Sequence, residues 1–379
     1  MRRILLVALM ALPLCAMGQD LNIHNMATAL QMPVKKQQSR PVATTKEMGK
    51  GEEAAMVVVE DTVYYRDLVR KYQWYEGRDS ISKEVAYHLP CYFRFTMKND
   101  AGHWQHVEAM CGDTMTTNHD ISHYVLDKRF DSGVSESSKI WVKRLATVTQ
   151  WFLTTGLDDN TVIEERAYDK NNLMVYSYLP TRNTNGRITA CYNNDWGLPV
   201  DMAEDSLYTY GSVVYIAMDR CGRDSIIDFL DGQGLPKLNT NGVDQQRYKY
   251  DGYDRIIESS SHNIVGDRIM DNWGNHGNTY EYDDDGNYTI TTIDKYRQPM
   301  QMPGLRADET RTYWKCCVTL DEYGRIAKRE MLDGDGNPGT TYSGIYLIRY
   351  SYEESPDGHY LRTRETRYYD DGRENTYYY

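Results

Sequence analysis

Apolar and polar positions alternate in short runs over the second half of the chain, and each run ends at an aspartate. Around Asp251 the chain reads YKYDGYDRIIES, and around Asp283 it reads YEYDDDGNYTIT. The apolar residues before each aspartate are two positions apart, so they share one face of a β-strand. A glycine or aspartate three positions after the leading aspartate suits a tight reversal. Each phrase therefore predicts a β-hairpin.

The same phrase heads four comparable units. Asp219, Asp251 and Asp283 are 32 residues apart, and Asp321 follows after 38 residues. A single hairpin cannot bury its apolar face alone, so tandem hairpins predict one sheet built from repeats. The remaining motif positions are the strand tyrosines and the turn residues, namely Tyr248, Tyr250, Tyr280, Tyr282, Gly222, Arg223, Arg255, Gly286, Gly324 and Arg325.

The repeated pattern also resembles a known family. The Tyr-x-Tyr-Asp-x-x-Gly-Arg/Asn phrase, with LDGQGLP at 230–236 and LDGDGNP at 332–338, resembles the YD repeats of Rhs-type proteins over about residues 180–379. The resemblance implies a β scaffold used for display, encapsulation or adhesion. We find no toxin domain after the repeats, and four to six units are too few for a closed shell. Export followed by such a repeat also resembles envelope proteins of Bacteroidetes-like bacteria.

The first 56 residues have a different composition. Residues 1–18 read as a secretory signal peptide, with Arg2 and Arg3 before an apolar core and a small-x-small site ending at Gly18. Lipidation at Cys15 is the alternative, but Leu14 before it is not small. Residues 19–56 contain no aromatic residue and predict a flexible leader. We divide the remainder into an irregular β-rich part, 57–180, and the hairpin array, 181–379.

Three stretches of the irregular part carry their own predictions. Residues 57–65, VVVEDTVYY, indicate a strand. Residues 93–110 indicate two strands joined by a turn at Asn99 to Gly102. Residues 139–155 fit a helical stripe and a β-branched strand equally well. The fold class follows: mainly β, with antiparallel hairpin repeats forming an open curved sheet.

Charge narrows the possible partners. The formal net charge is −12, and removal of Arg2 and Arg3 with the signal makes it more negative by two. An acidic chain lacks the electrostatic footprint of a nucleic-acid binder, and charge alone would not hold it on anionic lipid. No run after the signal is long and apolar enough to be a transmembrane segment.

The chemically richest stretch is HWQHVEAMCGDTMTTNHDISH, residues 103–123. Its candidate metal ligands are His103, His106, Glu108, His119 and His123. On a strand, His106 and Glu108 would lie on one face and His103 on the other, so the three would chelate a metal poorly. On a helix, His119 and His123 are four residues apart and could both ligate a metal. The ordinary alternative, an exposed loop that contains histidines, is the better interpretation.

Cysteine usage fits an oxidising compartment but does not identify an active site. Cys111 with a nearby histidine could form a thiolate nucleophile pair, yet no motif ranks it above the others. Disulfide bonds are the more ordinary fate, and six cysteines allow 15 connectivities. The candidates for pairing are Cys91, Cys111, Cys191, Cys221, Cys316 and Cys317.

The sequence therefore predicts a non-enzymatic repeat protein, exported to the periplasm, the outer membrane or the outside. It would bind a protein or glycan partner at the cell envelope through a Tyr-rich repeat face, with no cofactor and no catalytic residues. One alternative is a metal- or thiol-dependent hydrolase centred on residues 103–123. Another is a structural assembly scaffold. The preferred function is inferred from the type of scaffold and not from a binding or catalytic site, although function belongs to the site more than to the fold.

Overall fold

The fold is described from a computed structural model of the chain. It describes residues 62–99, 102–116, 144–145, 147–156, 161–202, 211–239, 241–272, 274–301, 313–341, 344–354 and 361–378. The signal peptide, the leader, His119 and His123 lie outside the described residues, so what the sequence indicates for them stays a prediction.

Short β-strands make up nearly all of the described secondary structure. The first part of the chain holds β1 (Val63–Lys71), β2 (Trp74–Ile81), a one-turn helix α2 (Lys83–Ala86), β3 (Tyr92–Phe95), β4 (His106–Cys111), β5 (Thr114–Met115), β6 (Val148–Thr155) and β7 (Val162–Asp169). The array continues with β8 (Met174–Arg182), β9 (Ile188–Asn194), β10 (Val213–Met218), β11 (Asp224–Leu230), β12 (Gln245–Tyr250), β13 (Ile256–His262) and β14 (Gly277–Tyr282). The last strands are β15 (Tyr288–Ile293), β16 (Lys315–Leu320), β17 (Ile326–Leu332), β18 (Ile345–Glu354), β19 (Leu361–Tyr369) and β20 (Glu374–Tyr378).

All of these strands belong to one antiparallel sheet. From β6 to β20 every strand pairs with its neighbours in sequence, as a row of hairpins must. The order changes only at the start, where β1 lies between β2 and β3, and β4 pairs with β3 and β6. The sheet is open, and the predicted fold class is confirmed.

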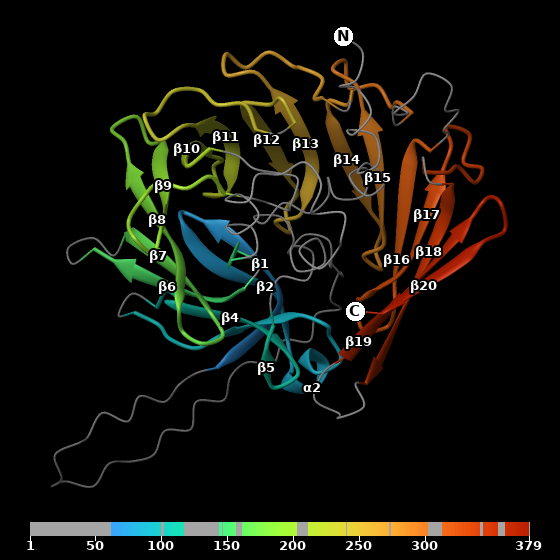
Figure 1. Cartoon of the computed structure of the whole chain (residues 1–379), viewed down its shortest axis with the longest axis horizontal. Helices are drawn as coiled ribbons and strands as arrows, with labels where there is room; N and C mark the ends of the chain where they lie inside the picture. Colours follow the sequence, from blue (N-terminus) through green and yellow to red (C-terminus); the bar gives the residue numbers. More distant parts are fainter. Residues whose placement is uncertain are drawn as a thin grey trace, which may run out of the picture.

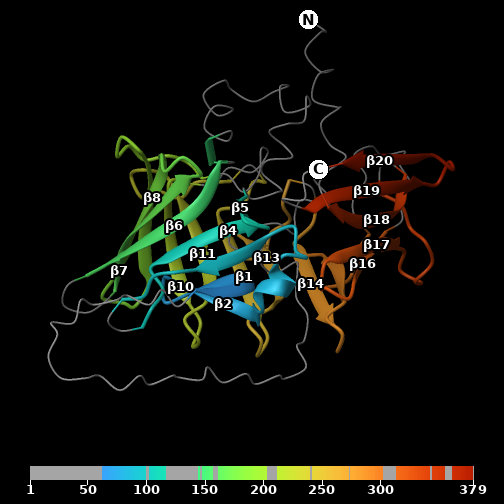
Figure 2. The same ribbon diagram turned by 90° about the horizontal axis from the view of Figure 1, so that it is seen from below.

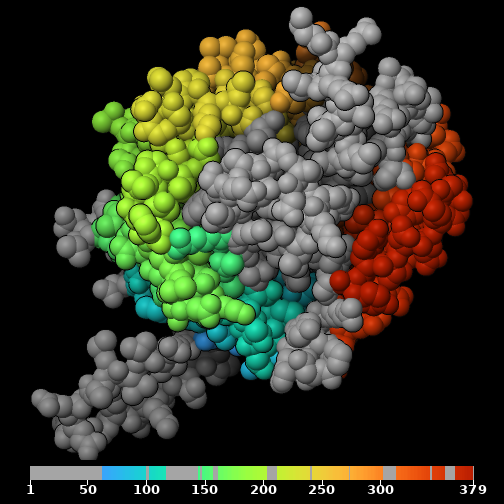
Figure 3. Space-filling model, in the orientation of Figure 1, coloured from blue at the N-terminus to red at the C-terminus, as the bar shows by residue number. Residues whose placement is uncertain are grey.

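The sheet bends into an arc around its own first strands. Figure 1 shows the strands following one another from β6 through β13 to β20, with β1 and β2 between the two sides of the arc. Figure 2 shows the same arrangement from the side, and Figure 3 shows the units as a continuous band in sequence order. The side of the sheet that faces β1 is called the inner face below.

Consecutive turns lie at opposite ends of the strands, because each strand reverses direction. One end, called the motif rim, carries the turns at 183–187, 219–223, 251–255, 283–287 and 321–325. The other end, called the distal rim, carries the turns at 169–173, 194–198, 231–235, 263–267, 294–298 and 333–337. The two rims hold different residue types and make different contacts.

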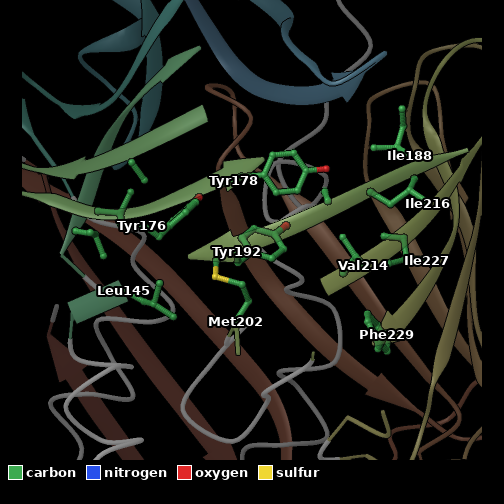
Figure 4. Close-up of a cluster of buried hydrophobic side chains, with 14 of the residues drawn as sticks. Leu145, Tyr176, Tyr178, Ile188, Tyr192, Met202, Val214, Ile216, Ile227 and Phe229 are labelled. Carbon is green, nitrogen blue, oxygen red and sulfur yellow. The ribbon is translucent and has the colours of Figure 1, made fainter. Parts of the chain in front are cut away.

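The main core lies on the inner face of the array. Two of its tyrosines, Tyr178 and Tyr192, are almost fully buried. Figure 4 shows these two rings beside each other, with Val214, Ile227 and Phe229 on the strands that follow. Their alternation along each strand places them on one face, as the sequence pattern predicted.

Two local predictions can be compared with the structure. The hairpin at 93–110 is confirmed: β3 pairs with β4, and the Gly102 N–H donates to the Asn99 carbonyl at 2.9 Å. In 139–155 the helical alternative is wrong for the part that forms β6, because Val148–Thr155 pairs with β4 and β7. Among the described residues no helix is long and apolar enough to cross a membrane.

Candidate functional site

The motif aspartate builds its turn from backbone bonds. The Oδ1 atom of Asp219 accepts the N–H groups of Cys221 at 2.8 Å and Arg223 at 3.0 Å. The same two bonds recur in the turns headed by Asp251 and Asp321. A short acidic side chain can satisfy two N–H groups that a tight reversal would leave open, which explains why aspartate leads each unit.

The motif arginine binds the same aspartate from the other side. The Nε atom of Arg223 donates to Oδ2 of Asp219 at 2.8 Å, and Arg255 donates to Asp251 at 2.6 Å. Although partial burial opposes its charge, the bonds from Arg223 hold the pKa of Asp219 below its usual value. The pair therefore fixes the arginine side chain in one direction.

That direction points at the next unit. The guanidinium carbon of Arg223 lies 4.6 Å from the ring centre of Tyr250, which ends the following motif strand. A planar cation over an aromatic face is attracted by the ring. The other members of the set are Arg255 over Tyr282 at 4.2 Å and Arg325 over Tyr352 at 4.3 Å.

The tyrosine hydroxyl completes the contact between units. In each case it donates to the carbonyl of the residue after the stacked arginine. The bonds run from Tyr250 to Asp224 at 2.8 Å, from Tyr282 to Ile256 at 3.0 Å and from Tyr352 to Ile326 at 2.9 Å. The aspartate, arginine and tyrosine of the motif thus form one set of contacts between units, called the interlock below. The recurring phrase joins each unit to the next.

The unit headed by Asp283 lacks this arginine, and the following strand lacks the tyrosine. Asn287 occupies the arginine position and donates to Oδ2 of Asp283 at 2.9 Å. Leu320 occupies the tyrosine position, and its N–H donates to Oδ1 of Asn287 at 2.8 Å. The two departures from the motif therefore match each other.

The first hairpin, β1 and β2, docks on the motif rim. The N–H of Tyr72, at its tip, donates to the carbonyl of Gly222 at 2.8 Å. The ammonium of Lys71 pairs with Asp254 at 2.6 Å, and Arg78 donates to the carbonyl of Asp254 at 2.6 Å. Two successive motif turns are thus held by one hairpin.

A third motif turn is held from farther along the same segment. Arg325 donates to the carbonyl of His88 at 2.8 Å, and the ring of His88 stacks on Tyr323 at 4.4 Å. Arg66 of β1 donates to the carbonyl of Tyr323. The N-terminal segment therefore spans turns that are about 100 residues apart in sequence, and it fixes the bend of the sheet.

Beneath the hairpin lies a buried polar network. Arg70 forms an ion pair with Glu165, which is fully buried, and its guanidinium carbon lies 4.3 Å from the ring centre of Tyr178. The Tyr178 hydroxyl donates to Gln73 at 2.6 Å. Burial opposes the charge of Arg70, but Glu165 outweighs it, so the pKa of Arg70 lies well above its usual value.

Asp224 closes this network against the array. The amide of Gln73 donates to its Oδ1 atom at 3.3 Å. Burial raises the pKa of Asp224 to about 6, an effect that Arg70 and Gln73 reduce but do not cancel. Perturbed carboxyl groups mark many active sites, but structural networks perturb them as well. Here the neighbours are core residues and the side chain is 6% exposed, which favours a structural role.

The metal candidates in β4 and its preceding loop have other partners. The His103 ring stacks on Trp74 at 4.5 Å. His106 contacts Thr96 at 2.7 Å and Gln150 at 3.1 Å through its two ring nitrogens, and Glu108 pairs with Arg94. Within the described ranges no group of three potential ligands could hold a metal ion. The three side chains are not brought together, and the role of His119 and His123 stays a prediction.

The cysteines lie at scattered places in the described part of the chain. Cys111 is buried in β4 and Cys221 is exposed in a motif turn. Cys191 donates to Oδ1 of Asn193 at 3.4 Å, and Cys317 contacts the Thr289 hydroxyl at 3.5 Å. Burial raises the pKa of Cys191, which disfavours the reactive thiolate. Their disulfide pairing stays a prediction.

The motif tyrosines pack inside the protein, and other side chains face solvent. Tyr248 is buried, while Tyr280 and Tyr282 are half-buried against the core clusters. By contrast, Trp196 in a distal turn is 81% exposed and Tyr253 in a motif turn is 75% exposed. The exposed aromatic residues that could meet a partner therefore lie at turn tips, a feature that the strand periodicity did not reveal.

Comparisons with known proteins add little to this description. No protein-family model matches the chain, and no curated protein matches it. A structure of the Tc holotoxin pore of Photorhabdus luminescens is similar at 10% sequence identity, over 76% of this chain and 16% of that chain, with a TM-score of 0.14. A TM-score this low supports no conclusion about function, so the function must be argued from the residues above.

Proposed function

We propose that this chain is a non-enzymatic exported repeat protein of the bacterial envelope or cell surface, which binds a protein or glycan partner through its hairpin array. The observation that carries the proposal is a division of roles within the units. Motif residues such as Arg255 and Tyr282 join unit to unit, whereas tip residues such as Trp196 and Val265 vary and face solvent. A constant scaffold with variable exposed tips is typical of repeat proteins that bind partners.

We further propose that the array is of the YD-repeat, Rhs-like type. Two features support this assignment: the hairpin that turns at each Tyr-Asp phrase, and the interlock between Arg223 and Tyr250. Export rests on the N-terminal sequence at residues 1–18.

The alternative of a hydrolase at residues 103–123 has no specific support from the geometry. His103, His106 and Glu108 each contact other side chains, and they come from positions that do not converge. A purely structural scaffold remains the third interpretation, and it differs from the proposal only in lacking a separate partner.

The proposal is tested first by location. Full-length chain with a C-terminal tag is expressed in intact cells, which are fractionated and treated with protease from outside. Tag in the envelope or outside, on a chain that has lost its signal, supports the proposal. An uncut chain that stays in the cytoplasm contradicts it.

Binding is then measured with the purified mature chain on glycan arrays and on envelope extract. Saturable binding that Trp196→Ser weakens, and that Tyr253→Ser leaves intact, supports the proposal. Turnover of a substrate that Cys111→Ala abolishes and Cys91→Ala spares would replace it with the hydrolase.

A further inference from the structure

Exposed apolar side chains follow one another along the distal rim. They lie in or shortly after five successive distal turns and are between 57% and 81% exposed. The set, called the apolar strip below, consists of Leu173, Trp196, Leu198, Leu235, Leu238, Val265 and Tyr296. The motif rim differs, since Tyr253 and Tyr72 are its large apolar residues that are more than half exposed among those described. Apolar exposure is therefore concentrated at one end of the strands.

The strip has a regular geometry. Successive distal turns are separated by two strands, so their tips lie about 10 Å apart, and five turns span about 40 Å along the arc. All of them lie at the same ends of the strands. A flat surface brought up to that end would meet the tips together, whereas a globular partner would have to follow the arc.

The tips are held rigidly. Oδ1 of Asn194 accepts the N–H groups of Trp196 and Leu198, both at 3.0 Å. Oδ1 of Asp294 accepts the N–H of Tyr296 at 2.8 Å. Because these hydrogen bonds already fix the backbone, binding through these side chains would cost little further backbone entropy.

Exposed cations accompany three of the turns. Lys170 and Lys295 lie in the turns that carry Leu173 and Tyr296, and Arg268 directly follows the turn that carries Val265. Nearby acids have partners within the protein: Asp195 pairs with Arg144 at 2.9 Å, and Oδ2 of Asp267 accepts from Asn263 at 3.2 Å. The exposed side chains of these turns are thus apolar, aromatic, basic or amide, and Asp267 is the exposed acid among the described residues there.

We propose that the apolar strip docks on the surface of a lipid bilayer. This inference rests on the export proposed above, and it goes beyond a protein or glycan partner. Trp196 and Tyr296 have the apolar body and polar tip that favour the membrane interface, the leucines and Val265 add apolar insertion, and the cations meet lipid phosphates.

A bilayer fits the strip better than a protein does. A stable protein interface buries about 800 Å² on each side in a continuous, shape-matched patch. The strip instead offers single side chains about 10 Å apart, and a bilayer accepts such side chains without a matching shape. Since the whole chain is acidic, insertion rather than charge must supply most of the binding, and binding should persist at high salt.

The test uses the purified mature chain with vesicles of phosphatidylcholine, alone or mixed with phosphatidylglycerol. We expect co-sedimentation with both, stronger with the mixture, and quenching of tryptophan emission by brominated lipid. The double variant Trp196→Ser/Tyr296→Ser should lower the partition coefficient at least tenfold, because two interfacial aromatic anchors are lost. Tyr253→Ser, at the opposite rim, should leave it unchanged.

Each result decides the inference. Failure to bind either vesicle, or binding that the double variant retains, overturns membrane docking. If vesicles do not bind but Trp196→Ser abolishes saturable capture of a protein or glycan, the strip serves that partner and the proposed function stands. If vesicle binding depends on the strip and no other partner is captured, the membrane docking stands while the proposed partner class fails.

Discussion

The hydroxyl of Tyr282 donates to the backbone carbonyl of Ile256 at 3.0 Å, across the boundary between two units. The same ring lies beneath the guanidinium of Arg255, with 4.2 Å between the guanidinium carbon and the ring centre. Because Arg255 is itself held by Asp251 at 2.6 Å, the unit headed by Asp251 contacts the unit headed by Asp283 in one fixed geometry. Stability between units should therefore depend on this tyrosine.

Tyr282→Phe should destabilise the protein by about 1 kcal/mol. The substitution removes the hydroxyl and leaves the Ile256 carbonyl without that donor, but it keeps the ring under Arg255. Tyr282→Ala should cost about 3–5 kcal/mol, because it also removes the ring. Urea denaturation followed by circular dichroism measures both values.

Tyr253 is the matched control for this prediction. It is a tyrosine of the preceding motif turn, but its side chain is 75% exposed. Tyr253→Phe should change the free energy of unfolding by less than about 0.5 kcal/mol. Equal effects of Tyr253→Phe and Tyr282→Phe would mean that the interlock does not stabilise the array.

The matched departures at Asn287 and Leu320 predict coupling between the two positions. Asn287→Arg alone should destabilise by about 1 kcal/mol, since it removes the acceptor of the Leu320 N–H and supplies no ring for the new cation. The double variant Asn287→Arg/Leu320→Tyr recreates the arginine–tyrosine pair of the other units. It should recover about 0.5–1 kcal/mol relative to the sum of the single variants.

This coupling is measured by a double-mutant cycle in urea. If the two single changes in the free energy of unfolding simply add, then the register of β15 and β16 does not bring an arginine and a tyrosine into contact. The inference that Asn287 and Leu320 match each other would then be wrong.

The alternation of apolar residues and the turn phrases were enough to predict hairpins, one repeat-built sheet and its open form. They could not predict which units touch through which side chains, because the contact between Arg255 and Tyr282 depends on the register between β13 and β14. The docking of β1 was missed for a similar reason. Arg66 and Arg70 stand next to Asp67 and Lys71 in the sequence, which favours exposure, yet both arginines are buried in the fold.

Docking of the first hairpin can be tested at one glycine. Gly222 has φ +80°, and a Cβ atom there would lie 2.5 Å from the ring of Tyr72. Gly222→Ala should therefore cost about 1 kcal/mol for the backbone and about 1–3 kcal/mol more for displacing the hairpin tip. It should also expose residues of β1 and β2 to proteolysis.

Gly234 separates the two effects. Its φ is +78°, nearly the same, but a Cβ atom there meets nothing within 4 Å. Gly234→Ala should cost only the backbone strain, about 1 kcal/mol, and leave proteolysis of β1 and β2 unchanged. Equal losses of unfolding free energy at the two glycines would show that Tyr72 does not pack against Gly222 at the motif rim.

Asp224 should make the protein less stable as pH rises. Burial raises its folded pKa to about 6, from 3.8 in the unfolded chain. The folded state therefore holds the proton more tightly, and stability is lost between these two values, by up to about 3 kcal/mol at pH 7. Asp224→Asn keeps an acceptor for Gln73 but carries no charge, so it should stabilise the protein above about pH 6 and lose that advantage toward pH 4.

Asp219, whose pKa is lowered, should behave oppositely: Asp219→Asn destabilises at neutral pH, and its effect fades as pH falls. Urea denaturation of both variants across this range decides the matter, and a pH-independent difference between Asp224→Asn and the parent would show that folding does not raise the pKa of Asp224.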